Sequence, residues 1–301
     1  MNQDKWSKEL ERISNRNYKK MDKELYNFYK DTLKKLKFEV KKYIEEYEEL
    51  SYSKRLEVKR QLEIAFILDE ILWNLSNNVQ PVIYKYIEYE LVEGYYGSWY
   101  SLENQANTNI SFKTLNQSYV ETLLDKKING KNFSKRLYEH RDQLAKEVTN
   151  ALIQGAKSGK GYKHIAKQIS ELTEANYKRA LRIARTEGGR VQSTVRQKSY
   201  TEAKQKGIDI RKRWIATLDE KTRESHADLD GVTIGVDEKF IYDGYEAYGP
   251  RLFGVAALDI NCRCSTISIV NGVGPDIRKD NITKEFIKYK NYNEWRKRRV
   301  G

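Results

Sequence analysis

Three side chains that could bind a metal ion together lie in the last third of the sequence. His226 precedes Cys262 and Cys264, and the two cysteines are separated by one residue. Imidazole nitrogen and thiolate sulfur are ligands that zinc prefers in proteins. We expect a turn between the two cysteines to bring their thiols to one site. The simpler alternative, which we favour from the sequence alone, is a pair of thiols packed in a small core.

Carboxylates and other polar residues, together with one glycine, surround His226 in the sequence. They are Asp219, Thr222, Arg223, Asp228, Asp230 and Gly231. Carboxylates beside an imidazole could perform acid–base chemistry, and Asp219 or Asp230 could be the fourth ligand that structural zinc requires. For the aspartates we favour a structural role, in which Asp219 caps the short helix that follows and Asp230 forms a turn with Gly231.

Arginines upstream of this cluster are the candidates for contact with nucleic acid. They are Arg179, Arg182, Arg185 and Arg190, within one predicted helix. The first three are spaced by three residues and share a helix face, where they could follow phosphates or form surface ion pairs. Glu187, which lies among them, most simply neutralises one of these arginines.

A glycine-rich turn at residues 155–161 does not have the spacing of a phosphate-binding loop. Such a loop has four residues between its first glycine and its Gly-Lys-Ser/Thr end. Here three residues separate Gly155 from Gly159, and Lys160 is followed by Gly161. We expect a turn that connects two helices.

The elements that position these residues change character near Gly207, which is a plausible helix C-cap. Before it, apolar residues recur at three- and four-residue steps, which predicts long amphipathic helices. The predicted helices cover about residues 21–50, 56–75 and 81–94, resume from about 133, and include a short helix around 164–169 and a long one over 174–206. After Gly207, alternating residues predict strands over 208–217, 232–234 and 265–270.

Several residues are expected to interrupt the helices of the first half. Asn77 and Asn78 should end the second helix, and Pro81 suits the first turn of the next. That helix should stop near Gly94 and Gly97, before a polar loop at residues 101–118.

The fold class that follows is α+β, with a long-helical N-terminal half and a small domain that contains a short antiparallel sheet. We expect a helical region over residues 1–130, an α+β domain over 131–272 and a basic tail over 273–301, which is either a helix or a mobile end.

Charge is concentrated in the region that carries the arginines. The chain has 301 residues and a formal net charge of +13, and residues 151–235 hold 18 basic and 10 acidic residues. DNA or an acidic protein surface is the natural partner of such a region, and a solubilising surface is the alternative. No run of about 18 apolar residues exists, which excludes a membrane span. The closely spaced cysteines and the absence of a secretion signal indicate the cytoplasm.

In their order along the chain, these residues resemble the Mu F-like domain of phage head morphogenesis proteins, also called minor head proteins. The resemblance covers about residues 140–270. It rests on Arg185-Thr186-Glu187, Trp214, Asp219, Thr222-Arg223, His226, Asp230-Gly231, Pro250 and Asn261-Cys262-Arg263-Cys264. We refer to these positions below as the signature residues, and the resemblance implies that they build the fold.

The resemblance implies a low-copy protein of the capsid interior, near the portal vertex, which is made in the host cytoplasm. Its expected partners are the portal protein, capsid or scaffold proteins and double-stranded DNA, and the long helices would dock onto the portal or shell. Its expected roles are procapsid assembly and DNA packaging or delivery. No catalytic reaction is established for the family as a whole, although related domains are fused to toxin modules. We therefore expect no enzyme activity and no cofactor, unless the cysteines and His226 bind zinc.

The alternative from another functional class is a metal-dependent nuclease or transferase. His226 would be its base or ligand, and Asp219 or Asp230 would complete the metal site. The sequence carries no complete catalytic signature for such an enzyme.

Overall fold

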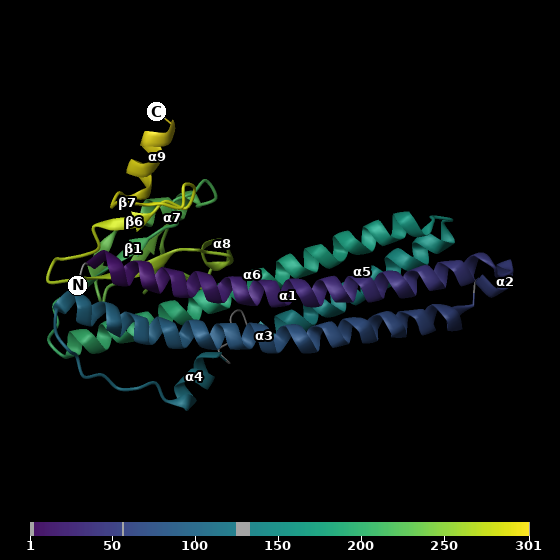
Figure 1. The fold of residues 1–301 in the computed structure, drawn as a ribbon, viewed down its shortest axis with the longest axis horizontal. Helices are drawn as coiled ribbons and strands as arrows, with labels where there is room; N and C mark the ends of the chain where they lie inside the picture. Colours follow the sequence, from purple (N-terminus) through teal and green to yellow (C-terminus); the bar gives the residue numbers. More distant parts are fainter. Residues whose placement is uncertain (1–2, 56, 125–132, 301) are drawn as a thin grey trace. The chain divides into compact units, whose positions relative to one another are not determined.

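The computed structural model describes residues 3–55, 57–124 and 133–300, and its fold is α+β (Figure 1). Its helices are α1 (Gln3–Glu48), α2 (Tyr52–Arg55), α3 (Val58–Ala106), α4 (Gln117–Leu124), α5 (Phe133–Lys157), α6 (Tyr162–Gln205), α7 (Glu224–Leu229), α8 (Ala256–Asp259) and α9 (Tyr292–Val300). Its strands are β1 (Ile210–Ile215), β2 (Thr233–Gly235), β3 (Phe240–Tyr242), β4 (Tyr245–Ala247), β5 (Ser265–Val270), β6 (Ile277–Lys279) and β7 (Phe286–Lys288).

The chain forms two compact units, and α1, α3 and α6 each contribute residues to both. The helical unit consists of Lys19–Lys85 and Gly130–Ile183. The mixed unit consists of Met1–Tyr18, Tyr86–Asn129 and Ala184–Gly301, and it contains all the strands of the described residues. The predicted boundary at residues 130 and 131 lies outside the described residues, and the three predicted domains stay a prediction.

In the helical unit, α3 continues through the predicted interruption at Asn77, Asn78 and Pro81. A proline inside a helix costs about 3 kcal/mol. Leu75, Val79 and Ile83 are all buried, however, and each contributes about 1.5–3 kcal/mol on burial. The buried stripe therefore outweighs the local penalty, and the prediction of two separate helices was wrong.

In the mixed unit, Gly94 and Gly97 do not end a helix, because α3 continues to Ala106. A Cβ at Gly94 would lie 2.9 Å from Cγ of Gln192, and one at Gly97 would lie 3.0 Å from Cδ2 of Leu10. These glycines thus permit close packing of helices. The loop predicted over residues 101–118 is therefore shorter, because its first residues belong to α3.

Helix α6 is also longer than predicted, since it joins the expected helices around 164–169 and 174–206 into one. Its buried residues Ile165, Ile169 and Thr173 continue at four-residue steps across the expected break. Gly207 does terminate this helix, with a φ of +86° and an amide that donates to the carbonyl of Lys204 at 2.9 Å.

The three predicted strands form one antiparallel sheet in the order β2-β1-β5. Lys212 in the central strand pairs with Ile234 on one side and Ser268 on the other. The sheet covers a core of Trp214, Ala216, Leu229, Phe240, Cys262 and Cys264. Two further hairpins, β3–β4 and β6–β7, were not predicted.

The C-terminal segment is folded rather than a mobile end. It forms β6, β7 and α9 (Figure 1). Tyr292 and Trp295 on α9 are buried together with Leu218 and Ala227. In the described part of the chain, no helix is long and apolar enough to span a bilayer.

Candidate functional site

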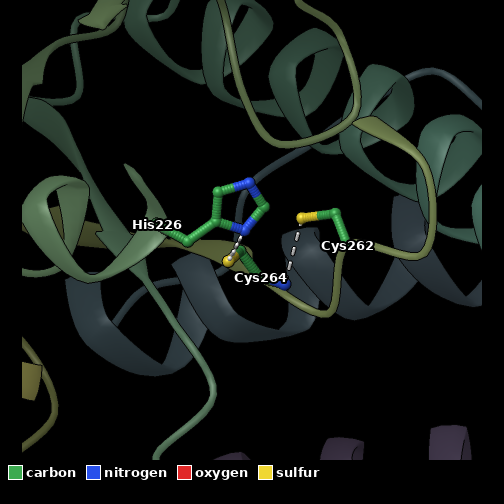
Figure 2. A group of neighbouring side chains, drawn as sticks. All are labelled: His226, Cys262 and Cys264. Carbon is green, nitrogen blue, oxygen red and sulfur yellow. Dashed lines mark hydrogen bonds between the residues drawn. The ribbon is translucent and has the colours of Figure 1, made fainter. Parts of the chain in front are cut away.

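The two cysteines lie on the loop between α8 and β5, and His226 reaches them from α7. Asn261, directly before Cys262, has a left-handed φ of +56°. The loop provides the expected turn, and the two sulfur atoms and the imidazole converge (Figure 2). One donor atom from each residue lies within 4.8 Å of the others, and all three residues are buried.

The tautomer of His226 follows from its surroundings. Its Nε2 lies 3.0 Å from the carbonyl oxygen of Leu258, and its Nδ1 lies 3.2 Å from Sγ of Cys264. A carbonyl oxygen only accepts hydrogen bonds, so Nε2 carries the proton in the neutral ring. The lone pair of Nδ1 is therefore directed toward the cysteine sulfur.

The two thiols have opposite electrostatic surroundings. A hydrogen bond from Cys264, supported by the guanidinium of Arg251 and by His226, holds the pKa of Cys262 well below its usual value. Burial raises the pKa of Cys264 well above its usual value. The backbone amide of Cys264 also approaches Sγ of Cys262 at 3.4 Å. The pair thus favours one thiolate, on Cys262.

Arg251 holds the cysteine loop against α6. Its Nε donates to the carbonyl of Cys262 at 2.8 Å, and its Nη1 donates to the carbonyl of Cys264 at 3.1 Å. The guanidinium fits against α6 only because residue 189 is glycine: a Cβ there would lie 2.1 Å from Cζ of Arg251.

The signature residues Arg185 and Thr186 attach the same loop through Asn261. Nη1 of Arg185 donates to Oδ1 of Asn261 at 2.8 Å, and Oγ1 of Thr186 accepts from the Asn261 amide at 3.0 Å. The guanidinium of Arg185 also lies over the ring of Tyr18, 4.8 Å from its centroid. These side chains therefore position the loop that carries the cysteines.

Glu187 neutralises Arg190, as predicted, through an N–O contact of 2.9 Å between two buried side chains. Arg190 also donates to the carbonyl of Leu123. Arg190 is therefore not placed to contact a phosphate, which corrects its selection as a nucleic-acid residue. Arg179 and Arg182 lie in the helical unit. Arg179 is half-buried and Arg182 is exposed, and both stay candidates for contact with nucleic acid.

Asp219 pairs with Arg263 instead of capping a helix. Both terminal guanidinium nitrogens of Arg263 donate to its carboxylate, one of them at 2.8 Å. Helix α7 begins later, at Glu224, and its N-cap residue is Arg223. Although burial acts in the opposite direction, Arg263 holds the pKa of Asp219 below its usual value.

Asp230 is the centre of a second buried network. Its carboxylate accepts from Arg278 at 2.7 Å, from the amide of Ala216 at 2.6 Å and from the amide of Tyr292 at 2.5 Å. Gly231 follows with a φ of +87°, as expected of the predicted turn.

The remaining signature residues also bind backbone or fill the core. Thr222 donates to the carbonyl of Thr217, and Arg223 donates to the carbonyls of Ala257 and Ile260. Trp214 is fully buried beside the cysteines in the core of the sheet.

Among the described residues, the only group of three or more histidine, cysteine or carboxylate side chains with metal-binding geometry is His226, Cys262 and Cys264. Asp219 and Asp230 are engaged by arginines and do not join it. Among the described residues, neither aspartate therefore provides the fourth zinc ligand that the sequence suggested. The acid–base cluster of the enzyme alternative is not assembled there either.

The sequence analysis did not identify Arg251, which binds the cysteine loop, or Arg278, which pairs with Asp230. Neither arginine is one of the signature residues. The adjacent glycines Gly188 and Gly189 within a helix were a usable signal for Arg251, because such positions indicate close approach of another group. No comparable signal indicated that Arg278 would meet Asp230.

Comparisons with known proteins cover both parts of the chain. Residues 146–267 match the family described as Phage Mu protein F like protein. The chain is 30% identical to "Minor head protein GP7" of Bacillus phage SPP1 over 309 residues, which cover 99% of the chain and 97% of that protein. It is 47% identical to "NAD(+)--arginine ADP-ribosyltransferase EFV" of Enterococcus faecalis over 291 residues. That alignment covers 97% of the chain but only 60% of the relative's length. No solved structure matches the chain.

Proposed function

Since the chain belongs to the phage Mu protein F like family of minor head proteins, we propose that it is itself a minor head protein of a tailed phage or prophage. The observation that carries this proposal is the alignment with the SPP1 minor head protein over nearly the whole length of both chains. That alignment includes the helical unit as well as the Mu F-like region. A shared domain alone would not extend over both.

The contacts of the signature residues support a structural role. Arg185, Thr186 and Arg223 hold the segments around the cysteine loop, and Asp219 and Asp230 are neutralised by arginines. A catalytic carboxylate needs access to substrate, whereas the side chain of Asp230 is fully buried. We therefore propose that this constellation builds the fold and catalyses no reaction.

We propose that the protein acts in few copies in the capsid interior, near the portal vertex, during procapsid assembly and DNA packaging or delivery. Its net charge of +13 supports a location beside DNA, because basic side chains release counterions from phosphates. Exposed apolar side chains of the helical unit support docking to the portal or shell. Phe38, Leu62 and Phe66 are 66%, 64% and 73% exposed, and a docking partner would remove this apolar surface from water.

For the enterococcal relative, we propose that the activity in its name resides in the part of its chain outside the alignment. The SPP1 relative supports this, because it aligns over 97% of its length and is named as a head protein alone. Incubation of the full chain with NAD⁺ and an arginine-rich acceptor protein tests the proposal. We expect no ADP-ribose on the acceptor by mass spectrometry, and transfer by the chain would overturn it.

The decisive experiment for the head-protein proposal is co-expression of the tagged chain with the portal and major capsid proteins of the phage or prophage that encodes it. We expect the portal protein to co-purify and virions to contain the chain. Virions without the protein, together with normal procapsids when its gene is deleted, would overturn the proposal.

A matched pair of variants tests the docking surface. Leu62→Ser/Phe66→Ser should reduce portal co-purification without lowering the melting temperature, because both side chains are exposed. The control, Glu63→Ser/Glu70→Ser, changes exposed positions of the same helix and should retain the portal. Equal recovery of portal by both variants would exclude this face of α3 as the docking surface.

A further inference from the structure

We propose that the mixed unit binds one zinc ion between Nδ1 of His226 and the Sγ atoms of Cys262 and Cys264, with water as the fourth ligand. This assigns a metal to residues for which the sequence alone favoured packed thiols. It is independent of the proposed role in the phage head, because it rests on the geometry of these three side chains alone.

The donor atoms are already gathered at nearly the required separation. Tetrahedral zinc, with bonds of about 2.3 Å to sulfur and about 2.1 Å to nitrogen, places its ligand atoms roughly 3.6–3.8 Å apart. Sγ of Cys264 lies 3.2 Å from Nδ1 of His226, and the three donor atoms lie within 4.8 Å of one another. The two sulfur atoms lie beside the imidazole (Figure 2), so their donor atoms already surround one common point.

The groups around the ligands are arranged as a metal site requires. A histidine that binds zinc commonly donates its other N–H to a carbonyl or carboxylate, which fixes the ring and leaves a lone pair for the metal. Leu258 supplies that carbonyl, 3.0 Å from Nε2 of His226. Two hydrogen bonds from Arg251 fix the backbone of both cysteines.

Trp214 gives independent support. Its indole N–H is buried and has no acceptor within hydrogen-bond geometry in the part of the chain that the structure describes. The indole packs in the same core as both cysteines, and its ring centroid lies 6.1 Å from that of His226. A zinc-bound thiolate is a better acceptor than a neutral thiol, so metal binding provides the partner that this buried donor lacks.

The alternative is a metal-free core in which a cysteine S–H donates to Nδ1 of His226. Both arrangements bury the same side chains, and they differ in the state of the thiols. Zinc requires two thiolates and releases protons on binding, whereas the metal-free arrangement keeps at least one protonated thiol.

The test uses the full chain, purified without chelator from cells grown with added zinc. We expect about one zinc ion per chain by elemental mass spectrometry. A mercurial reagent that reacts with both cysteines should release this zinc to a chromogenic dye. The cobalt-substituted protein should show sulfur-to-cobalt charge-transfer absorption. These measurements use the unmodified protein and do not depend on whether a variant folds.

Variants identify the ligands. Cys262→Ser, Cys264→Ser and His226→Ala should each reduce bound metal to a small fraction of the wild-type amount. His164→Ala, at an exposed histidine outside the site, and Asp219→Asn, at a carboxylate paired with Arg263, should retain it. A chain that stays metal-free after incubation with excess zinc and gel filtration, without thiolate bands in cobalt, would overturn the proposal. Portal co-purification reports separately on the proposed function.

Discussion

The guanidinium of Arg251 occupies the space that a side chain at position 189 would need. A Cβ at Gly189 would lie 2.1 Å from Cζ of Arg251, and the same guanidinium donates to the carbonyls of Cys262 and Cys264. A glycine within α6 and an arginine on a distant loop are therefore parts of one contact, which fixes the cysteine loop.

We expect Gly189→Ala to lower the free energy of unfolding by about 1–3 kcal/mol, because the added methyl group overpacks this contact. The change in intrinsic helix propensity, about 1 kcal/mol in favour of alanine, acts in the opposite direction. Urea unfolding of the single variants Gly189→Ala and Arg251→Lys and of the double variant measures the coupling. Additive effects of the two substitutions would contradict a direct steric contact between these positions.

The two aspartate networks should differ in strength. The Asp230–Arg278 pair has side chains that are 0% and 6% exposed, whereas those of Asp219–Arg263 are 16% and 29% exposed. Asp230→Asn leaves a buried guanidinium without its anion, so we expect a loss of about 3–5 kcal/mol in the free energy of unfolding. Asp219→Asn should cost about 1 kcal/mol, since water compensates part of the loss. Chemical denaturation measures both losses. If the two variants lose similar amounts of unfolding free energy, burial does not determine the strength of the two ion pairs.

Lys212 should make stability depend on pH. Burial lowers its pKa to about 8, although Asp237 and Glu238 act in the opposite direction. Its ammonium group donates to Gln197 Oε1 at 2.9 Å and to the carbonyl of Tyr248 at 3.0 Å, with no carboxylate among these acceptors. Below pH 8 the cost of burying this charge is fully present. Between pH 8 and 10.5 the unfolded chain binds more protons than the folded chain, so the free energy of unfolding should rise with pH, by up to about 3 kcal/mol.

The difference between the wild type and Lys212→Met isolates this contribution from other titrating groups. Denaturation of both proteins from pH 7 to 9.5 should show the stability of the wild type rising relative to that of the variant. Parallel curves would mean that Lys212 keeps an ordinary pKa in the folded protein.

Arg179 and Arg182 provide the test of DNA binding. Arg179→Gln/Arg182→Gln should weaken binding to duplexes of any sequence, and the slope of log K against log salt concentration should fall by about 2 if each arginine contacts one phosphate. Arg190→Gln is the matched contrast at the buried Glu187 pair, and it should lower thermal stability instead. Fluorescence anisotropy at several salt concentrations measures the slope. An unchanged slope in the double variant would remove these two arginines from the DNA-binding surface.

The parts of the fold that were predictable are those in which local pattern and packing agree. The alternation of residues around Trp214 predicted β1, because alternation is the local pattern of a strand. Gly207 predicted the end of α6, because glycine readily adopts the positive φ that it has there. The signature residues were recognised from their order along the chain.

The errors occurred where tertiary packing outweighs local preference. Pro81 and Gly94 were read as helix boundaries, but one lies in a continuous buried stripe and the other in a close helix contact. The partners of buried charges could not be predicted from the sequence either. Asp230, for example, pairs with Arg278, which is 48 residues away along the chain. Such contacts depend on the finished topology and leave no periodic pattern in the sequence.

The mixed unit draws on both ends of the chain, which has a consequence for its biosynthesis. Glu11 pairs with Lys279 at 2.6 Å, and Lys8 lies over the ring of Phe286, 5.1 Å from its centroid. At roughly 5–20 residues per second of translation, the first residues wait about 15–50 s for these partners to be synthesised. The beginning of α1 therefore completes its contacts only after the ribosome has made the last hairpin, and an incomplete chain presents an unfinished mixed unit to the cell.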